Sequence, residues 1–180
     1  MDPAQRFADA WRARCGLRPL DHPTFSGVSS VWRVELHPAQ GDDVAVTVSD
    51  LDAGGFVEVR ALDRAGRDHA MIDAGLTPWT RPLPEVHSRV WEAAVTADAL
   101  AAMQSRLPRL PLHSEAPGAD GMVVHHEARV EGVHHRFASW SPSPVRAPLH
   151  YAFVLALCDL AVRAAPESGA VIHPLARYLR

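Results

Sequence analysis

The chain has 180 residues, of which 47% are hydrophobic and 22% charged, and its formal net charge is −3. These are the proportions of an ordinary globular protein, so disorder of the whole chain is excluded, and a chain of this length can bury a sizeable core without metals or disulfides. All 18 basic residues are arginine, which is typical of a GC-rich bacterial genome, and they are spread along the chain without a basic run. This distribution argues against nucleic-acid binding.

The sequence indicates neither membrane insertion nor secretion. Its longest fully apolar run, residues 151–158, is far too short to span a bilayer. The first four residues, Met-Asp-Pro-Ala, lack the basic and then apolar pattern of a signal peptide. We therefore expect a cytoplasmic protein without membrane contact, in which Cys15 and Cys158 are free, partly buried thiols.

The first part of the chain predicts a helix followed by strands. Asp2 and Pro3 form a favourable helix start and Gly16 a favourable stop, which predicts a helix over residues 3–15. After a loop, apolar and polar residues alternate as they do in strands with one buried face. The predicted strands are 31–37, 43–49 and 56–62, with a turn at 50–55, and residues 63–75 are expected to be irregular with room for a short helix.

Prolines interrupt the middle of the chain. Three prolines within residues 78–84 exclude regular structure around Trp79. Residues 85–95 then predict another strand. Thr96 is a good N-cap for a helix that must stop before Pro108.

A hairpin and a helix are predicted next. Glu131 and Gly132 form a two-residue turn between strands 122–130 and 133–140. The segment 148–164 begins with proline and is apolar on nearly all sides, as expected of a buried helix.

The order of these elements predicts an α+β fold. We expect an antiparallel sheet with helices packed on one face and a buried C-terminal helix after the hairpin. Residues 1–180 are interpreted as a single domain, and a weak division near residues 76–84 stays open.

Four histidines in the predicted hairpin raise the question of a metal site. A two-residue turn places His126 and His135 on the mostly apolar face of the sheet and His125 and His134 on the charged face. At most two of the four can meet, whereas a structural zinc site needs four protein ligands and a catalytic one needs three. A metal would therefore need a ligand from elsewhere, such as His150 or Asp159.

No motif for a particular chemistry is present. The sequence contains no Gly-x-Ser-x-Gly nucleophile elbow, no glycine-rich phosphate loop and no His-Glu-x-x-His zinc motif. We therefore expect no cofactor and no enzymatic activity.

The hypothesis that fits this pattern best is a non-enzymatic bacterial interaction protein, such as an immunity or inhibitor protein that binds a partner protein. Exposed aromatic and charged side chains are the expected contacts, because such residues contribute most to binding in protein interfaces. In the predicted register Glu127 lies opposite Arg136. The candidate partner-binding residues are Trp79, Arg81, Glu127, Arg129, His134 and Arg136.

Two alternatives stay open. The first is a small-ligand-binding protein or a metal-dependent, hydrolase-like enzyme that uses His126, His135 and His150. The second is a structural subunit that forms a homodimer through the edge of the hairpin. The sequence does not predict the oligomeric state.

Overall fold

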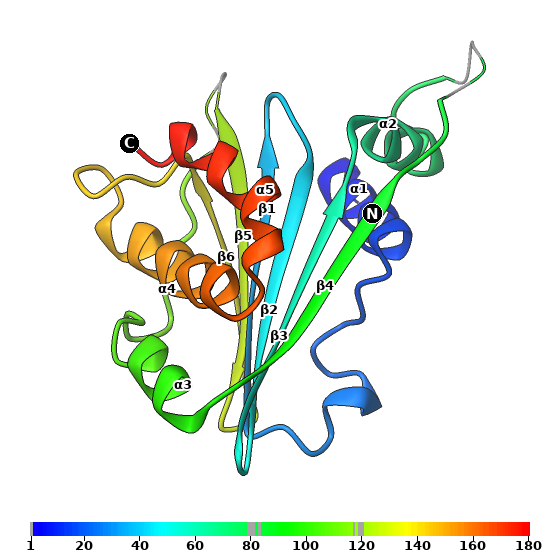
Figure 1. Ribbon diagram of the computed structural model, residues 1–180. Coiled ribbons are helices and arrows are strands. Elements are labelled where there is room, and N and C mark those ends of the chain that lie inside the picture. Colours follow the sequence, from blue (N-terminus) through cyan, green and yellow to red (C-terminus); the bar gives the residue numbers. More distant parts are fainter. Residues whose placement is uncertain (1, 79–81, 83, 117, 119–120) are drawn as a thin grey trace.

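A six-stranded antiparallel sheet forms the centre of the molecule, with the spatial order β4-β3-β2-β1-β5-β6 (Figure 1). The computed structural model describes residues 2–78, 82, 84–116, 118 and 121–180. The strands are β1 (Ser30–Pro38), β2 (Asp43–Leu51), β3 (Gly54–Leu62), β4 (Ser88–Val95), β5 (Met122–Val130) and β6 (Val133–Trp140). The helices are α1 (Pro3–Cys15), α2 (Arg64–Asp73), α3 (Ala97–Gln104), α4 (Pro148–Ala164) and α5 (Gly169–Ile172), with 3₁₀ turns at Pro23–Phe25, Pro166–Ser168 and His173–Tyr178.

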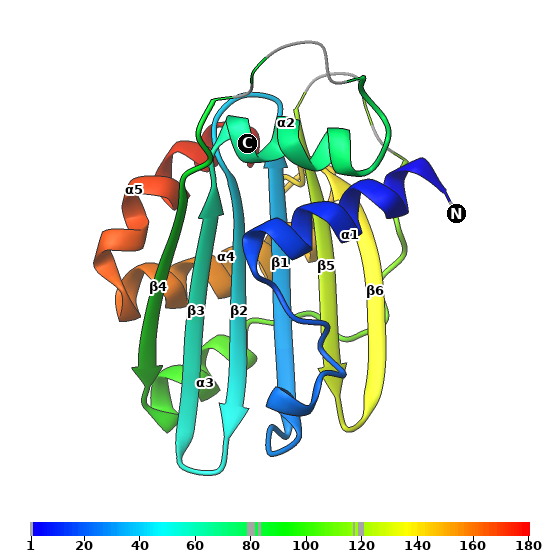
Figure 2. The same ribbon diagram turned by 90° about the vertical axis from the view of Figure 1, so that its right-hand side faces the viewer.

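The helices form two layers around the sheet. α3, α4 and α5 cover one face, and α4 is the buried helix that follows the hairpin (Figure 1). The predicted α+β class, with its antiparallel sheet and buried C-terminal helix, is confirmed. In addition, α1 and α2 lie against one end of the opposite face and leave its other end to the segment 17–29 (Figure 2).

Most of the core lies between the sheet and α4. Val34, Val46 and Val59 are fully buried and form one row across β1, β2 and β3. Phe153 and Leu157 of α4 are also fully buried in this cluster. An apolar helix is needed here because one face of the sheet consists almost entirely of apolar side chains.

The ends of the predicted helices are confirmed. The Asp2 side chain accepts a hydrogen bond from the Ala4 backbone N–H at 3.4 Å, and Gly16 ends α1 with a φ of +70°. The Thr96 hydroxyl accepts a hydrogen bond from the Ala99 N–H at 3.2 Å at the start of α3. These caps satisfy backbone groups that have no partner within the helix.

The segment 63–75 is more regular than the sequence indicates, because it forms the ten-residue helix α2. Asp63 caps this helix through a 2.8 Å hydrogen bond from the Gly66 N–H. Gly66 is part of the packing, because a Cβ at this position would lie 2.4 Å from the Leu62 side chain. The glycine therefore allows close contact between α2 and β3.

Both cysteines are free and buried, as predicted. They belong to separate clusters, with Cys15 in the cluster under α1 and α2 and Cys158 in the main core. Burial raises the pKa of each thiol to about 12, so both are inert near neutral pH. Among the described residues, no helix is both long and apolar enough to cross a membrane.

The sheet includes strands from both sides of residues 76–84, because β3 and β4 pair directly along their length. The hairpin register is the predicted one, with His126 opposite Phe137 and Ala128 opposite His135. This register determines which hairpin side chains share a face.

We expect Leu157→Ala to lower the free energy of unfolding by about 2–5 kcal/mol, because it opens a cavity between α4 and the sheet. Leu149→Ala is the matched control on the same helix, since Leu149 is 54% exposed. Urea denaturation of both variants measures the difference. Equal losses in the two variants would contradict the assignment of α4 as the core helix.

Candidate functional site: the charged face of the sheet

One row of mostly charged side chains crosses the sheet on the face opposite α4. In the observed register each strand contributes one residue to this row. In spatial order from β4 to β6, the polar row consists of Glu92, Glu58, Thr47, Arg33, Glu127 and Arg136. Because strand residues alternate between faces, none of these side chains enters the main apolar core.

Glu127 lies between two arginines of the polar row, Arg33 and Arg136. Its Oε1 accepts a hydrogen bond from Arg136 Nε at 2.8 Å and lies 2.8 Å from His134 Nε2. Its Oε2 lies 3.6 Å from Arg33 Nη1, and the side chain is only 4% exposed. Burial by itself raises the pKa of Glu127, but the positive charges of Arg33, Arg12 and Arg136 outweigh it and lower the pKa. The buried carboxylate is therefore ionised at neutral pH.

A second buried carboxylate joins α1 to the sheet. Arg12 Nε and Nη2 of α1 donate hydrogen bonds to the two carboxylate oxygens of Glu35 at 2.8 and 3.1 Å. This bidentate geometry matches the planar guanidinium and makes the ion pair stronger than a single hydrogen bond would. It places a charged α1 side chain beside the polar row.

Arg33 is a buried charge of the row whose hydrogen bonding is incomplete. Its side chain is 1% exposed, and its Nε donates a 3.0 Å hydrogen bond to the Thr47 hydroxyl. Its Nη1 is buried without a hydrogen-bond partner, because the 3.6 Å separation from Glu127 exceeds hydrogen-bond distance. Burial lowers the pKa of Arg33, but a guanidinium stays protonated at all physiological pH values.

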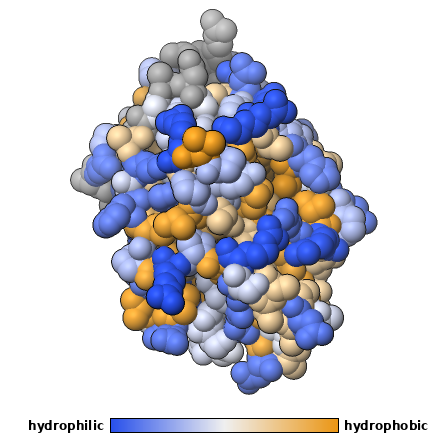
Figure 3. All heavy atoms as spheres, turned by 90° about the vertical axis from the view of Figure 1, so that its left-hand side faces the viewer, coloured by the Kyte–Doolittle hydropathy of each residue, from blue (hydrophilic) through white to orange (hydrophobic). Residues whose placement is uncertain are grey.

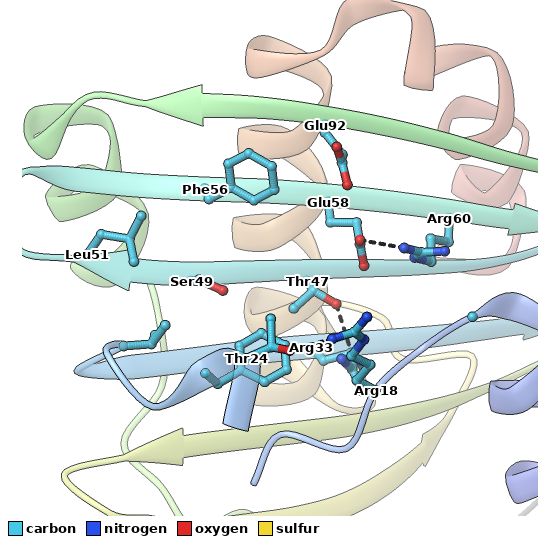
Figure 4. A pocket seen from close by; sticks show the side chains of 13 residues that line it. Arg18, Thr24, Arg33, Thr47, Ser49, Leu51, Phe56, Glu58, Arg60 and Glu92 are labelled. Atoms are coloured by element: carbon cyan, nitrogen blue, oxygen red, sulfur yellow. Dashed lines mark hydrogen bonds and ion pairs between the residues drawn. The ribbon is translucent and has the colours of Figure 1, made fainter. Parts of the chain in front are cut away.

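A cavity of about 380 Å³ lies between the segment 17–29 and strands β1 to β4. Arg18 and Arg33 lie at one end, and Glu58 and Glu92 lie across the cavity from them (Figure 4). Arg60, which is paired with Glu58, also lines the cavity. The apolar lining comes from Phe25, Val28, Leu51 and Phe56. The volume is within the range of small-ligand sites, and more than half of the lining residues are polar or charged.

Specific hydrogen bonds hold the segment that covers this cavity. Arg129 Nη2 donates to the carbonyl oxygens of Phe25 and Val28 at 2.7 and 3.4 Å. Within the segment, Arg18 Nη1 donates to the Thr24 hydroxyl at 2.5 Å. The segment is thus fastened to β5 by an arginine from the hairpin.

The structure brings together part of the predicted partner-binding set. Glu127, His134 and Arg136 form one cluster, in which Arg136 is 56% exposed and Glu127 is buried. Arg129 lies nearby but is used to hold the segment 17–29. The other two candidates, Trp79 and Arg81, lie outside the described residues. That these residues contact a partner stays a prediction.

Two of the three histidines of the metal hypothesis, His126 and His150, lie side by side, and His135 lies apart from them. His126 and His150 have ring centroids 5.4 Å apart, but His126 Nε2 lies 2.8 Å from the Ser139 hydroxyl and His150 Nε2 lies 2.9 Å from the His113 carbonyl. His135 lines a different cavity. In the part of the chain that the structure describes, no three His, Cys, Asp or Glu side chains are arranged to hold a metal.

Sequence reasoning missed the main basic residues of the cavity, Arg18 and Arg33, as well as Thr47. The alternation in β1 does put Arg33 and Glu35 on the same polar face. Long charged residues on the polar face of a strand in the middle of a sheet are the signal for this site, because water is largely excluded there and such charges need partners.

A second hollow, of about 370 Å³, lies between α4 and the C-terminal turns. Its lining is largely apolar and includes Leu155, Val162 and Leu175. On this side of the molecule, hydrophilic and apolar side chains are intermingled (Figure 3). The hollow has fewer charged groups than the cavity beside Arg33.

Comparison of the chain with protein-family models, curated proteins and solved structures finds no match. Arguments about function therefore rest on the charged face itself.

We expect Glu127→Gln to lower the free energy of unfolding by about 3–5 kcal/mol, because it leaves Arg33 buried without its nearest negative charge. Arg136→Gln removes a partner of the same carboxylate at an exposed position and is expected to cost about 1 kcal/mol or less. Chemical denaturation at pH 7 compares the two. Equal effects would show that burial of the Arg33–Glu127 pair is unimportant.

The stability of the protein should fall between pH 6.5 and pH 4. Burial lowers the pKa of His125 to about 4 and that of His126 well below its ordinary value. In the unfolded chain these two histidines bind protons near pH 6.5, whereas in the folded chain they stay neutral to lower pH. The free energy of unfolding therefore has its full value above pH 6.5 and decreases as the pH falls below it. Each histidine contributes up to about 1.4 kcal/mol per pH unit to this loss.

The variant His126→Phe tests this origin, because phenylalanine keeps an aromatic ring against Phe137 and has no titrating group. Urea unfolding at pH 6.5 and pH 5.0 should show a loss smaller by up to about 2 kcal/mol than in the unmodified protein. His87→Gln, at an exposed position, should leave the pH dependence unchanged. An unchanged pH dependence in His126→Phe would refute the assignment.

Proposed function

We propose that the protein is a non-enzymatic interaction protein that binds a partner protein through the part of its charged face beside β4 and the cavity, as an immunity or inhibitor protein does. The main support is the composition of this surface. Leu51 and Val90 are 42% and 46% exposed there, beside the cavity and the acidic end of the polar row. Exposed apolar residues among charged ones are typical of surfaces that form protein interfaces.

The position of β4 adds a second argument. This strand is at the end of the sheet, and no described strand pairs with its outer side. Val90 and Glu92 of β4 project on the charged face, since they lie opposite Arg60 and Glu58. A partner can therefore reach the charged face and a free backbone edge together, and an open strand edge is a common place for a partner peptide to bind.

The proposal includes a cytoplasmic location and no role for nucleic acid. It is supported by the pairing of many arginines with carboxylates of the same chain, as in Arg12–Glu35, Arg67–Asp43 and Arg106–Asp159. Paired arginines leave less positive charge to attract phosphate groups.

The alternative that uses the hairpin histidines has less support. His126 and His150 are adjacent, but each directs one ring nitrogen to a partner within the fold. A ligand or metal would have to replace Ser139 or the His113 carbonyl to reach those nitrogens.

The experiment is co-expression with the products of neighbouring genes, followed by light scattering and calorimetry on any complex. Val90→Glu and Leu51→Glu are each expected to weaken the complex at least about tenfold, because they put a charge into the apolar part of the interface. Val145→Glu is the matched control, since Val145 is also exposed but lies between β6 and α4.

Two outcomes would refute the proposal. One is that none of the neighbouring gene products binds. The other is that Val145→Glu weakens a complex as much as Val90→Glu does.

A further inference from the structure

We propose that the cavity beside Arg33 is a carboxylate-binding site, in which Arg33 and Arg18 hold an aspartate or glutamate side chain of the partner protein. This inference deepens the proposed function and rests on it only for the source of the carboxylate. The site itself is argued from the cavity, its charges and its donors.

Arg33 gives the strongest reason to expect an anion. It is almost completely buried and lines the cavity, yet its Nη1 has no hydrogen-bond partner. The nearest carboxylate, Glu127, does not lie within hydrogen-bond distance of Nη1 and is shared with Arg136 and His134. The buried charge of Arg33 is therefore incompletely compensated, and a carboxylate in the cavity would add a second negative charge close to the guanidinium.

Arg18 adds a second positive charge at the same end of the cavity (Figure 4). It comes from the covering segment and is exposed. Among the described residues, its hydrogen-bond partner is the neutral hydroxyl of Thr24. None of the ion pairs formed between described residues involves Arg18. Three guanidinium groups therefore line the cavity. Arg60 is paired with Glu58, Arg33 is incompletely hydrogen-bonded, and Arg18 forms no ion pair within the described residues.

The opposite end of the cavity limits what kind of anion fits. Glu58 and Glu92 line it and are directly opposite each other on β3 and β4. Glu58 is paired with Arg60 at 2.8 Å, which leaves Glu92 as the main repulsive charge. A doubly charged phosphate is repelled more strongly than a singly charged carboxylate, and a carboxylate also matches the planar guanidinium.

The apolar walls suit the rest of an acidic side chain. Phe25 and Phe56 also line the cavity. Phe56 lies on β3 to one side of the charged groups (Figure 4). An aspartate or glutamate of a partner would place its methylene groups against these rings and its carboxylate at the arginines. The exposed Leu51 at the rim would contact the residues that flank it.

The site is tested on the full chain by NMR, through the Nε–Hε resonances of the arginines. The probe is acetyl-glutamate amide, which carries one side-chain carboxylate, with acetyl-glutamine amide as its neutral match and inorganic phosphate as the competing oxyanion at equal ionic strength. We expect saturable shifts of Arg33 and Arg18 with the glutamate probe, none with the glutamine probe, and weaker binding of phosphate.

Substitutions at exposed positions test the charges without disturbing the buried Arg33. Arg18→Gln should weaken binding of the glutamate probe about fivefold or more, and Glu92→Gln should tighten it about twofold. Arg146→Gln, at an exposed arginine next to α4, should have no effect.

The inference is overturned if the Arg33 resonance shows no saturable shift, if the glutamine probe shifts it equally, or if phosphate binds more tightly than the glutamate probe. It is also overturned if Arg18→Gln and Glu92→Gln leave binding unchanged.

Its failure is distinguishable from failure of the proposed function. If the glutamate probe does not bind but Val90→Glu weakens the partner complex, the site is refuted and the docking face stands. If the probe binds but Val90→Glu and Leu51→Glu leave the complex unchanged, the proposed docking face is refuted and the site stands. If the probe binds and Val90→Glu weakens the complex but Arg18→Gln does not, the partner is refuted as the source of the carboxylate.

Discussion

The carboxylate of Glu127 is the interaction on which the charged face depends. It lies between a fully buried arginine on β1 and an exposed arginine on β6, and it keeps its negative charge because these neighbours outweigh the effect of burial. Arg33 can occupy the middle of the sheet only because this counter-charge is close. Since Arg33 also lines the cavity that we propose binds a carboxylate, stability and the proposed recognition share one ion pair.

The two faces of the sheet differ in composition and in what covers them. On the α4 face, rows of valine are covered by an apolar helix, and this arrangement supplies most of the core. On the other face, α1 and α2 cover one end and the segment 17–29 lies over the other (Figure 2). Charged side chains line the cavity beneath this segment. Burying charged side chains without partners costs free energy. Such a surface is therefore best suited to a partner whose charged groups pair with those left unpaired in the free protein.

The sequence predicted what depends on local pattern and missed what depends on distant contacts. Strand alternation and the Glu131-Gly132 turn were enough to predict the hairpin, its register and the Glu127–Arg136 pair. The helix α2 was underestimated because Gly66 suggested a break, whereas its small size serves contact with Leu62. The role of Arg33 was not predictable, because its partner on β5 comes from a remote part of the chain and no local pattern specifies that pairing.

The strand order has a consequence for how the chain assembles. β1 pairs with β2, which follows it at once, and with β5, which is synthesised only after all of β1 to β4. During synthesis the first four strands can form a sheet while one side of β1 still has unsatisfied backbone groups and Arg33 still lacks Glu127. The hairpin of β5 and β6 closes that edge and neutralises that charge in one event. Folding should therefore be limited by this long-range closure, as it is in proteins of high contact order.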